Sequence, residues 1–384
     1  MKIVIAPDSF KGSLTAKEVS QAIYAGIKPI FPAADYELIP MADGGEGTME
    51  TLVSANEGKI LTTSVRSPLN YLVEAKYGLL ENQDTAVIEM AQASGIQYIT
   101  AETANPLIAT TFGSGQLIKA ALDQDVKKII IGLGGSATND GGAGMAQALG
   151  AKLLDRFGNE IPFGGGHLND LDHIDITDLD PRLKNVKIIL ASDVKNPLTG
   201  KNGASAVFGP QKGATPEMVK ILDQNLQHFA AIVKKDLHLD LANIPGAGAA
   251  GGLAFGLMAF AGAQLHSGID LVLKETNFAQ KVKAANLVFT GEGGTDFQTQ
   301  YGKTPFGVAQ LAKKIAPDCS VICLTGNIGA GIDQLYGDDK IDAIFATESG
   351  AKDLAQAMKD SSNDIKILSE NIARLLKSYH FSQN

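Results

Sequence analysis

The chain has 384 residues, a length at which two domains are expected rather than one. Hydrophobic residues make up 45% and charged residues 20%, which is the composition of an ordinary globular enzyme. The formal net charge of −9 leaves no basic stripe to neutralise phosphates, so we expect no nucleic-acid partner.

The sequence also predicts a cytoplasmic protein with no membrane span. The opening apolar run, residues 3–6, is too short for the core of a signal peptide. Residues 247–265 carry no charge, but Gly and Ala dominate them, which favours a glycine loop followed by a buried helix. Cys319 and Cys323 match neither a redox pair nor a zinc knuckle, so we expect buried free thiols. The oligomeric state stays open, and a homo-oligomer is compatible with the sequence.

The first sixty residues alternate between strand and helix patterns. Residues 2–6 are a short apolar run typical of a parallel strand. Thr15 and Glu18 form a capping box, after which apolar residues recur at helical spacing. A second strand is expected at 38–41, and a helix from about Thr48.

The last hundred residues repeat this alternation. Strands are expected near 287–289, 321–324 and 343–346. One intervening helix is predicted to open with Thr304 as its N-cap and Pro305 as its first residue. Alternation of this kind indicates a parallel sheet with helices on both faces.

The middle of the chain is less regular. Residues 63–82 and 84–90 are typical of strands whose pairing is uncertain, whereas 128–131 and 187–191 are strong strand patterns. Between the last two, residues 155–185 are rich in turn signals.

These patterns predict an α/β protein. We expect a Rossmann-like parallel-sheet domain formed by both chain ends, residues 1–62 and 285–384. A second α/β domain with a mixed sheet, residues 63–284, interrupts it.

Six segments rich in small residues carry the candidate chemistry. We interpret each as a loop that follows a strand and holds an acid, an amide or a hydroxyl. In open α/β sheets, ligands bind at the carboxyl ends of the strands, where loop amides and helix N-termini present positive dipole. The segments are 7–13, 42–48, 132–142, 192–197, 245–252 and 290–299. Any one alone could be a turn with a helix cap, but six together favour a ligand site.

The segment 132–142 permits two interpretations. Gly132, Gly134 and Ala137 satisfy the G-x-G-x-x-A fingerprint of dinucleotide binding, so an NAD(P)-dependent reductase of a small hydroxy acid is one alternative. The continuation Thr-Asn-Asp-Gly-Gly delays the helix and adds side chains suited to phosphate or Mg²⁺. A Walker A motif ending at Gly302-Lys303-Thr304 is excluded, because Phe297 stands where glycine is needed.

Carboxylates in these segments favour phosphoryl transfer over hydride transfer. Transfer to an alcohol needs Mg²⁺ on the phosphates, a cation on the transferred group and often a carboxylate that takes the hydroxyl proton. The acids and lysines in the segments or next to them are Asp8, Asp43, Glu46, Asp140, Asp193, Glu292, Asp296, Lys11, Lys195 and Lys303. Each acid could instead cap a helix or a turn. The sequence has no His/Cys cluster, so a transition metal is not expected.

At these segments the sequence resembles the bacterial glycerate kinase family that shares the Asp-Ser-Phe-Lys-Gly-Ser opening. The resemblance runs the length of the chain and covers 7–13, 42–48, 132–144, 193–198, 245–253, 290–293 and single positions up to Pro305. It implies ATP and Mg²⁺ as cofactors, D-glycerate as acceptor, and phosphoglycerate as product, with 2-phosphoglycerate favoured over 3-phosphoglycerate. It also implies a site in the cleft between two α/β domains. Members often carry a basic or polar residue where this chain has Gly294.

The loops and the resemblance together give candidate roles. The catalytic candidates are Asp193 as proton acceptor, with Lys11 and Asp8. Candidates for binding the substrate are Ser9, Ser13, Asp43, Gly44, Gly45, Glu46, Asp296, Gln298 and Lys303. Candidates for binding the nucleotide are Gly134, Gly135, Ser136, Asn139, Asp140, Asn196, Gly248 and Gly251. Glu292 and Asp296 are the metal candidates. A non-catalytic hydroxy-acid-binding protein is a second alternative, which fits poorly with so many loop carboxylates.

Overall fold

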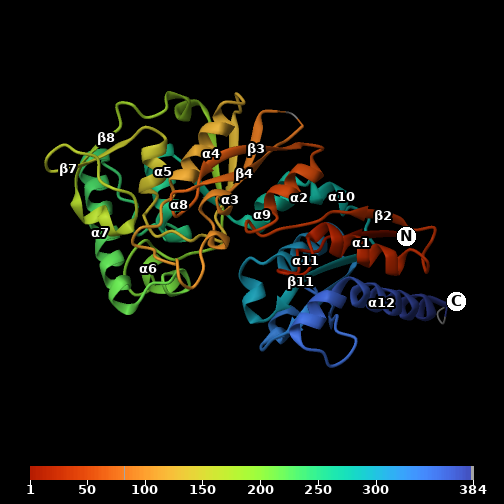
Figure 1. Ribbon diagram of the computed structural model, residues 1–384. Coiled ribbons are helices and arrows are strands. Elements are labelled where there is room, and N and C mark those ends of the chain that lie inside the picture. Colours follow the sequence, from red (N-terminus) through yellow and green to blue (C-terminus); the bar gives the residue numbers. More distant parts are fainter. Residues whose placement is uncertain (82, 382–384) are drawn as a thin grey trace. The chain divides into compact units, whose positions relative to one another are not determined.

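The computed structural model describes residues 1–81 and 83–381, with side chains as far as Ser378. The chain divides into two compact units. The terminal unit contains Met1–Asp43 and Gly268–Asn384, and the central unit contains Gly44–Ser267. In Figure 1 the terminal unit holds the red and blue ends of the chain, and the central unit holds the orange, yellow and green segments. The sequence-based domain boundaries at 62 and 285 stay predictions.

The sheet of the terminal unit is parallel throughout its described strands, in the order β13-β12-β11-β1-β2. These strands are β1 (Lys2–Ile5), β2 (Asp35–Leu38), β11 (Leu287–Thr295), β12 (Ser320–Ile328) and β13 (Ala343–Ala346). Because β1 pairs with β11, the two ends of the chain build one sheet, as the sequence predicts.

Helices cover both faces of this sheet. They are α1 (Ala16–Ile27), α9 (Gly268–Glu275), α10 (Phe278–Lys281), α11 (Thr304–Ile315) and α12 (Leu354–Phe381), with short turns at η6 (Phe297–Tyr301) and η7 (Ile332–Leu335). The capping box at the start of α1 is confirmed: Thr15 Oγ1 accepts from the Glu18 N–H, and Glu18 accepts from the Thr15 N–H at 2.8 Å. Helices α1 and α12 lie side by side, and a side chain at Gly26 would collide with the Lys366 carbonyl (Figure 1).

The predicted second strand is displaced by three residues. Strand β2 runs over Asp35–Leu38 rather than 38–41. It lies at the edge of the sheet and is largely half-exposed, so it lacks the apolar run that marks an interior strand. Ile39 and Met41 are buried beyond it and donate to the carbonyls of Ile5 and Pro7 at 2.8 and 2.9 Å.

The predicted cap of α11 is wrong by one residue. Lys303 is the N-cap, Thr304 is the first helical residue and Pro305 follows it. The Thr304 hydroxyl does not cap the helix, because it donates to Asp8 Oδ2 at 2.6 Å. A contact between residues far apart in sequence therefore takes precedence over the local cap.

The central unit contains a mixed sheet, whose described strands follow the order β10-β9-β6-β5-β4-β3. They are β3 (Lys59–Arg66), β4 (Leu72–Leu79), β5 (Thr85–Glu89), β6 (Lys128–Gly132), β9 (Lys187–Ala191) and β10 (Gln264–His266). Strands β3, β4 and β5 pair antiparallel, and β5, β6, β9 and β10 pair parallel. A separate antiparallel pair joins β7 (Lys152–Asp155) to β8 (Leu171–Asp175). The predicted α/β class, with one parallel and one mixed sheet, is confirmed.

The helices of the central unit are α2 (Thr48–Ala55), α3 (Ala91–Ser94), α4 (Phe112–Leu122), α5 (Ala143–Ala148), α6 (Ala204–Phe208), α7 (Pro216–Leu237) and α8 (Leu253–Ala261). Short turns occur at η1 (Ile96–Tyr98), η2 (Gly165–Asp170), η3 (Pro181–Asn185), η4 (Pro210–Lys212) and η5 (Ala249–Gly252). Within the apolar segment 247–265, η5 precedes the nine-residue helix α8, and β10 begins at Gln264. Across the described helices, none combines the length and apolarity that a membrane crossing requires.

Two of the six segments are not loops that follow a strand. Residues 290–295 belong to β11 itself, which extends to Thr295 because it pairs with β12 along its whole length. Segment 245–252 comes after α7 and an irregular stretch, and it contains η5. There Ala250 and Gly251 adopt left-handed backbone, at φ 53° and 67°.

Close packing between two backbones requires Gly251. The Gly251 carbonyl accepts from the Gly141 N–H at 3.1 Å, and a Cβ on Gly251 would collide with the Thr138 carbonyl. Segment 245–252 thus supports loop 132–142 from behind, with no room for a side chain between them.

Replacing Gly251 by alanine is expected to destabilise the fold far more than the same change at Gly262. Both glycines have left-handed backbone, at φ 67° and 60°, so both alanines carry the same backbone cost of about 1–2 kcal/mol. A Cβ at Gly262 meets nothing within 4 Å, so only Gly251→Ala adds a collision. Urea unfolding should show Gly251→Ala costing roughly 2 kcal/mol more than Gly262→Ala. Equal losses would contradict this account of the packing.

Candidate functional site

Three parallel strands of the central unit end at one level. Glu89, Gly132 and Ala191 are neighbours in the register of β5, β6 and β9. The loop that begins at Gly44 lies against these ends, because a Cβ on Gly44 would be 2.8 Å from the Ala191 carbonyl oxygen. A Cβ on Gly134 would likewise be 2.9 Å from Gly45. The predicted loops 132–142 and 192–197 therefore start from the same edge of the sheet, and residues 44–48 of the predicted segment 42–48 lie against it.

A buried lysine contacts loop 132–142 through two hydrogen bonds. Lys212, at the end of η4, is 1% exposed and donates to Ser136 Oγ at 2.7 Å and to the Thr138 carbonyl at 2.6 Å. Burial lowers its pKa to about 7, and the neighbouring Asp140 opposes that shift. Sequence reasoning missed Lys212, because Gly-Pro-Gln-Lys-Gly is typical of an ordinary surface turn.

Asp140 anchors the same loop from within. Its carboxylate is fully buried and accepts from the Thr111 N–H at 2.8 Å, from the Thr111 hydroxyl, and from the N–H groups of Gly142 and Gly144. Burial raises the pKa of Asp140, and these donors lower it. The contacts give Asp140 a role in shaping the loop, and its contact with nucleotide stays a prediction.

Two buried polar atoms of this loop lack a hydrogen bond among the described residues, Thr138 Oγ1 and Asn139 Oδ1. The amide nitrogen of Asn139 is engaged, since it donates to Ser205 Oγ at 2.9 Å. More than about nine in ten buried polar groups in proteins are paired. Two adjacent unpaired oxygens in a glycine-rich loop are what a site for a polar ligand would contain.

Glu89 is a second group that sequence reasoning missed. It is buried at the end of β5 and accepts from the Met49 N–H at 2.9 Å, at the start of α2. Burial and the nearby charges of Glu50 and Glu46 raise its pKa to about 7, against the opposing effect of the Met49 N–H. Glu89 is the last residue of a strand that is buried throughout, and the sequence pattern of that strand does not indicate a functional carboxylate.

Asp8 organises the corresponding edge of the terminal unit. It follows β1 and is 8% exposed, with Oδ1 accepting from the Ser9 N–H and Oδ2 from the Thr304 hydroxyl, each at 2.6 Å. Burial and the charge of Asp43 raise its pKa to about 7, against the opposing effect of Lys11. A carboxyl group with such a pKa can hold or release a proton near neutral pH.

Glu292 lies on the adjacent strand and forms an ion pair with Lys303 at 3.1 Å. Thr299 also donates to Glu292 Oε1 at 2.7 Å, and Lys303 donates to the Gly294 carbonyl at 3.0 Å. Burial raises the pKa of Glu292, and Lys303 opposes that rise. Asp296 caps η6, accepting from the Gln298 N–H at 2.8 Å.

The described residues contain no group of three or more acidic, His or Cys side chains that could hold a metal ion by themselves. Magnesium in phosphoryl-transfer sites is usually bound by one or two carboxylates together with substrate phosphates. The pair Glu292 and Asp296 fits that mode, and its role stays a prediction.

The remaining candidates fall into two groups. Some are held by internal contacts: Ser13 donates to the Met358 carbonyl at 2.7 Å, Asn196 donates to the Asn202 carbonyl at 2.8 Å, and Gly248 packs on the Pro197 carbonyl. Others reach the surface wholly or in part: Ser9, Lys11, Asp43, Gly45, Glu46, Gly134, Gly135, Asp193 and Gln298. Binding roles remain predictions for both groups.

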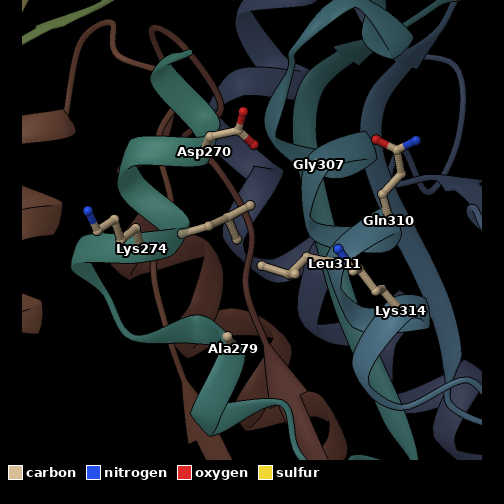
Figure 2. Close-up of a pocket in the computed structure, with 8 residues that line it drawn as sticks. Asp270, Lys274, Ala279, Gly307, Gln310, Leu311 and Lys314 are labelled. Atoms are coloured by element: carbon tan, nitrogen blue, oxygen red, sulfur yellow. The ribbon is translucent and has the colours of Figure 1, made fainter. Parts of the chain in front are cut away.

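A hollow of about 380 Å³ in the terminal unit contains none of the candidates. Figure 2 shows it between α9 and α10 on one side and α11 on the other. Asp270, Lys274 and Lys314 are exposed at its rim, and Leu273 and Leu311 lie deeper. The hollow therefore does not belong to the candidate site.

Parallel strand ends that carry glycine loops, buried carboxylates and a buried lysine are typical of α/β proteins that bind polar ligands. Comparison with protein families makes this specific. The model described as "Glycerate kinase family" matches residues 3–377. The chain belongs to the glycerate kinase family, so the predictions of the family and of a kinase enzyme are confirmed.

Individual relatives agree with the family match. The chain is 50% identical to "Glycerate kinase" of Bacillus subtilis over 98% of each chain. It is also 50% identical to "Glycerate 2-kinase" of Escherichia coli, again over 98% of each. A crystal structure from Salmonella typhimurium LT2, assigned provisionally as glycerate kinase 2, has a TM-score of 0.88, with 48% identity and 99% of each chain covered.

The raised pKa values of Asp8 and Glu89 predict how stability depends on pH. Between about pH 4 and pH 7 the folded protein holds more protons on these groups than the unfolded chain does. The free energy of unfolding should therefore fall as the pH rises through this window. Asp8→Asn and Glu89→Gln should each flatten that fall, by an amount on the order of 3 kcal/mol across the window.

Urea unfolding at a series of pH values measures this slope. Glu18→Gln is the control, because the capping contact with Thr15 lowers the pKa of Glu18, so its contribution grows as the pH rises past the ordinary value of 4.5 and has the opposite sign in this window. The same slope in wild type and in both test variants would contradict the assignment.

Proposed function

We propose that this chain catalyses the ATP-dependent phosphorylation of D-glycerate, with 2-phosphoglycerate as the product. The observation that carries the proposal is the identity of 50% over 98% of the chain to relatives named glycerate kinase and glycerate 2-kinase. The acids and lysines of the candidate loops are the groups that such a reaction needs. Mg²⁺ would neutralise charge on the transferred phosphoryl group, with Glu292 and Asp296 as its protein ligands.

Loop 132–142 is the proposed binding site of the ATP phosphates. Gly134 and Gly135 are exposed, and Gly135 has left-handed backbone at φ 73°, so backbone N–H groups are accessible to a close anion. Asn139 lies in the same loop, and its unpaired Oδ1 only accepts hydrogen bonds, so it suits an N–H or O–H donor of the nucleotide rather than a phosphate oxygen. In the dinucleotide fingerprint a helix begins within the glycine motif, whereas here the helix begins only at Ala143. The late start favours a phosphate-binding loop over a site for a nicotinamide nucleotide.

Glycerate is a small anion and needs a local cation. Lys11 is exposed on the loop after β1, near enough to Asp8 to affect its pKa. We assign to Lys11 a contact with the glycerate carboxylate or with the transferred phosphoryl group. Ser9 lies on the same loop, and Asp43 is close enough to Asp8 to affect its pKa. Both are further candidates for polar contacts with the substrate.

Asp193 is the proposed proton acceptor. It lies two residues beyond the buried strand β9, on a rigid support, and is half-exposed. In the proposed step the substrate hydroxyl loses its proton to Asp193, its oxygen bonds to the γ-phosphorus, and the bond to the ADP oxygen breaks. Asp8 is the second candidate for this role, because a pKa of about 7 suits a general base near neutral pH.

Incubation of the protein with ATP, Mg²⁺ and D-glycerate should yield 2-phosphoglycerate and ADP, identified by ³¹P NMR. In a thermal melt ATP with Mg²⁺ should raise the melting temperature, and NADH should leave it unchanged. Stabilisation by NADH with no kinase turnover would support the reductase. Tight glycerate binding with no turnover would support a binding protein, and 3-phosphoglycerate as product would overturn the regiochemistry alone.

Asp193→Asn is expected to lower kcat by about 10²–10⁴-fold, the usual contribution of a positioned base, with ATP affinity retained. Asp296→Asn should instead raise the Mg²⁺ concentration needed for half-maximal rate. Asp172→Asn, an exposed acid of the same unit as Asp193, is the matched control and should have wild-type kinetics. If excess Mg²⁺ restores Asp193→Asn and has no effect on Asp296→Asn, the two roles must be exchanged.

A further inference from the structure

Lys212 is a buried lysine of the central unit. A lysine that is 1% exposed loses its hydration, and its replacement by a neutral residue would remove that cost. Lys212 nevertheless makes two short hydrogen bonds, to Ser136 Oγ and to the Thr138 carbonyl, two residues apart on one loop. Nothing in the local turn at Pro210–Lys212 needs the ammonium group, so its use lies in the loop that it contacts.

The chemistry of these partners fixes where the Ser136 proton goes. A protonated lysine only donates, so Ser136 Oγ must accept from it. A hydroxyl has a single proton, and that proton must then point away from Lys212 toward another acceptor. Among the described residues, no hydrogen bond is donated by the Ser136 hydroxyl. An O–H group, 8% exposed, is thus left free to donate to a ligand.

We propose that Lys212 is a positioning residue that makes the Ser136 hydroxyl a donor to a phosphate of the bound nucleoside triphosphate. Its second bond, to the Thr138 carbonyl, holds the loop in the same conformation. The proposal rests on the proposed function, because it takes the occupant of loop 132–142 to be a nucleotide phosphate. It adds a residue that lies behind the loop and touches no ligand itself.

Charge supports the same assignment. In the described structure, the titratable group that acts on Lys212 is Asp140, whose carboxylate is already satisfied by backbone and hydroxyl donors. The pKa of Lys212, at about 7, leaves the ammonium and amine forms close in energy at neutral pH. Phosphate charge close to Ser136 favours the ammonium form, which is the form that directs the Ser136 proton outward.

A double-mutant cycle tests the coupling. Lys212→Met and Ser136→Ala should each raise the KM for ATP by about 10- to 100-fold, the value of one hydrogen bond to a charged group. The double variant should be no worse than the poorer single variant, because both remove the same contact. The KM for glycerate should stay within about two-fold of wild type, a split that general unfolding would not produce. Lys220→Met, an exposed lysine of the same unit, is the matched control.

The outcomes separate the inference from the proposed function. If wild type shows no kinase activity, the function itself fails. If wild type is active, an unchanged KM for ATP in Lys212→Met overturns the role of Lys212. If the two fold-increases in the KM for ATP multiply in the double variant, Lys212 acts independently of Ser136. If the KM for ATP and the KM for glycerate rise equally, the role of Lys212 is purely structural. Each of these results removes the proposal.

A second measurement decides the matter should Lys212→Met not fold. Ser136→Ala keeps the lysine, and the ATP Kd of wild type and of this variant can be compared by calorimetry across pH. The ratio of the two Kd values should be largest below the Lys212 pKa of about 7 and approach one well above it. Neutral Lys212 can accept the Ser136 proton, so the donor to phosphate is then lost in wild type too. A ratio that does not change with pH would overturn the proposal.

Discussion

The close approach of bare backbones at the ends of β5, β6 and β9 is the constraint on which the central unit depends. A Cβ on Gly132 would lie 2.8 Å from the Gly44 carbonyl oxygen, and one on Gly251 would collide with Thr138. Side chains are therefore excluded from these contacts, and three separate segments lie against one another. The arrangement leaves loop 132–142 supported from behind by segment 245–252 and accessible at Gly134 and Gly135. High glycine content is here a packing requirement rather than a sign of flexibility.

Each unit holds ionisable groups in places where their charged forms are costly. In the terminal unit this is Asp8, and in the central unit it is Glu89, Asp140 and Lys212. Asp8, Asp140 and Lys212 are bonded to backbone or hydroxyl groups of a loop next to a strand end, and Glu89 is bonded to the first turn of α2. Fixed, desolvated charges of this kind interact more strongly with a ligand than hydrated surface charges do. The stability that they cost is consistent with selection for a binding or catalytic role.

Membership of the glycerate kinase family and the local geometry answer different questions. The family match over residues 3–377 shows what kind of enzyme the chain is. The contacts of Lys303 with Glu292, and of Lys212 with Ser136, suggest how its loops are held for that chemistry. Neither contact is visible in a comparison of whole chains.

The sequence alone determined the α/β class, the capping box at Thr15, the strand patterns and the family, because each depends on local periodicity or on a contiguous motif. It did not place β2, since an edge strand lacks an apolar run, nor the start of α11, since Thr304 bonds to Asp8 from across the fold. The sequence also could not show that Lys212 and Glu89 are buried beside the candidate loops. Burial and hydrogen-bond partners are set by segments far apart along the chain, and only the tertiary structure brings those segments together.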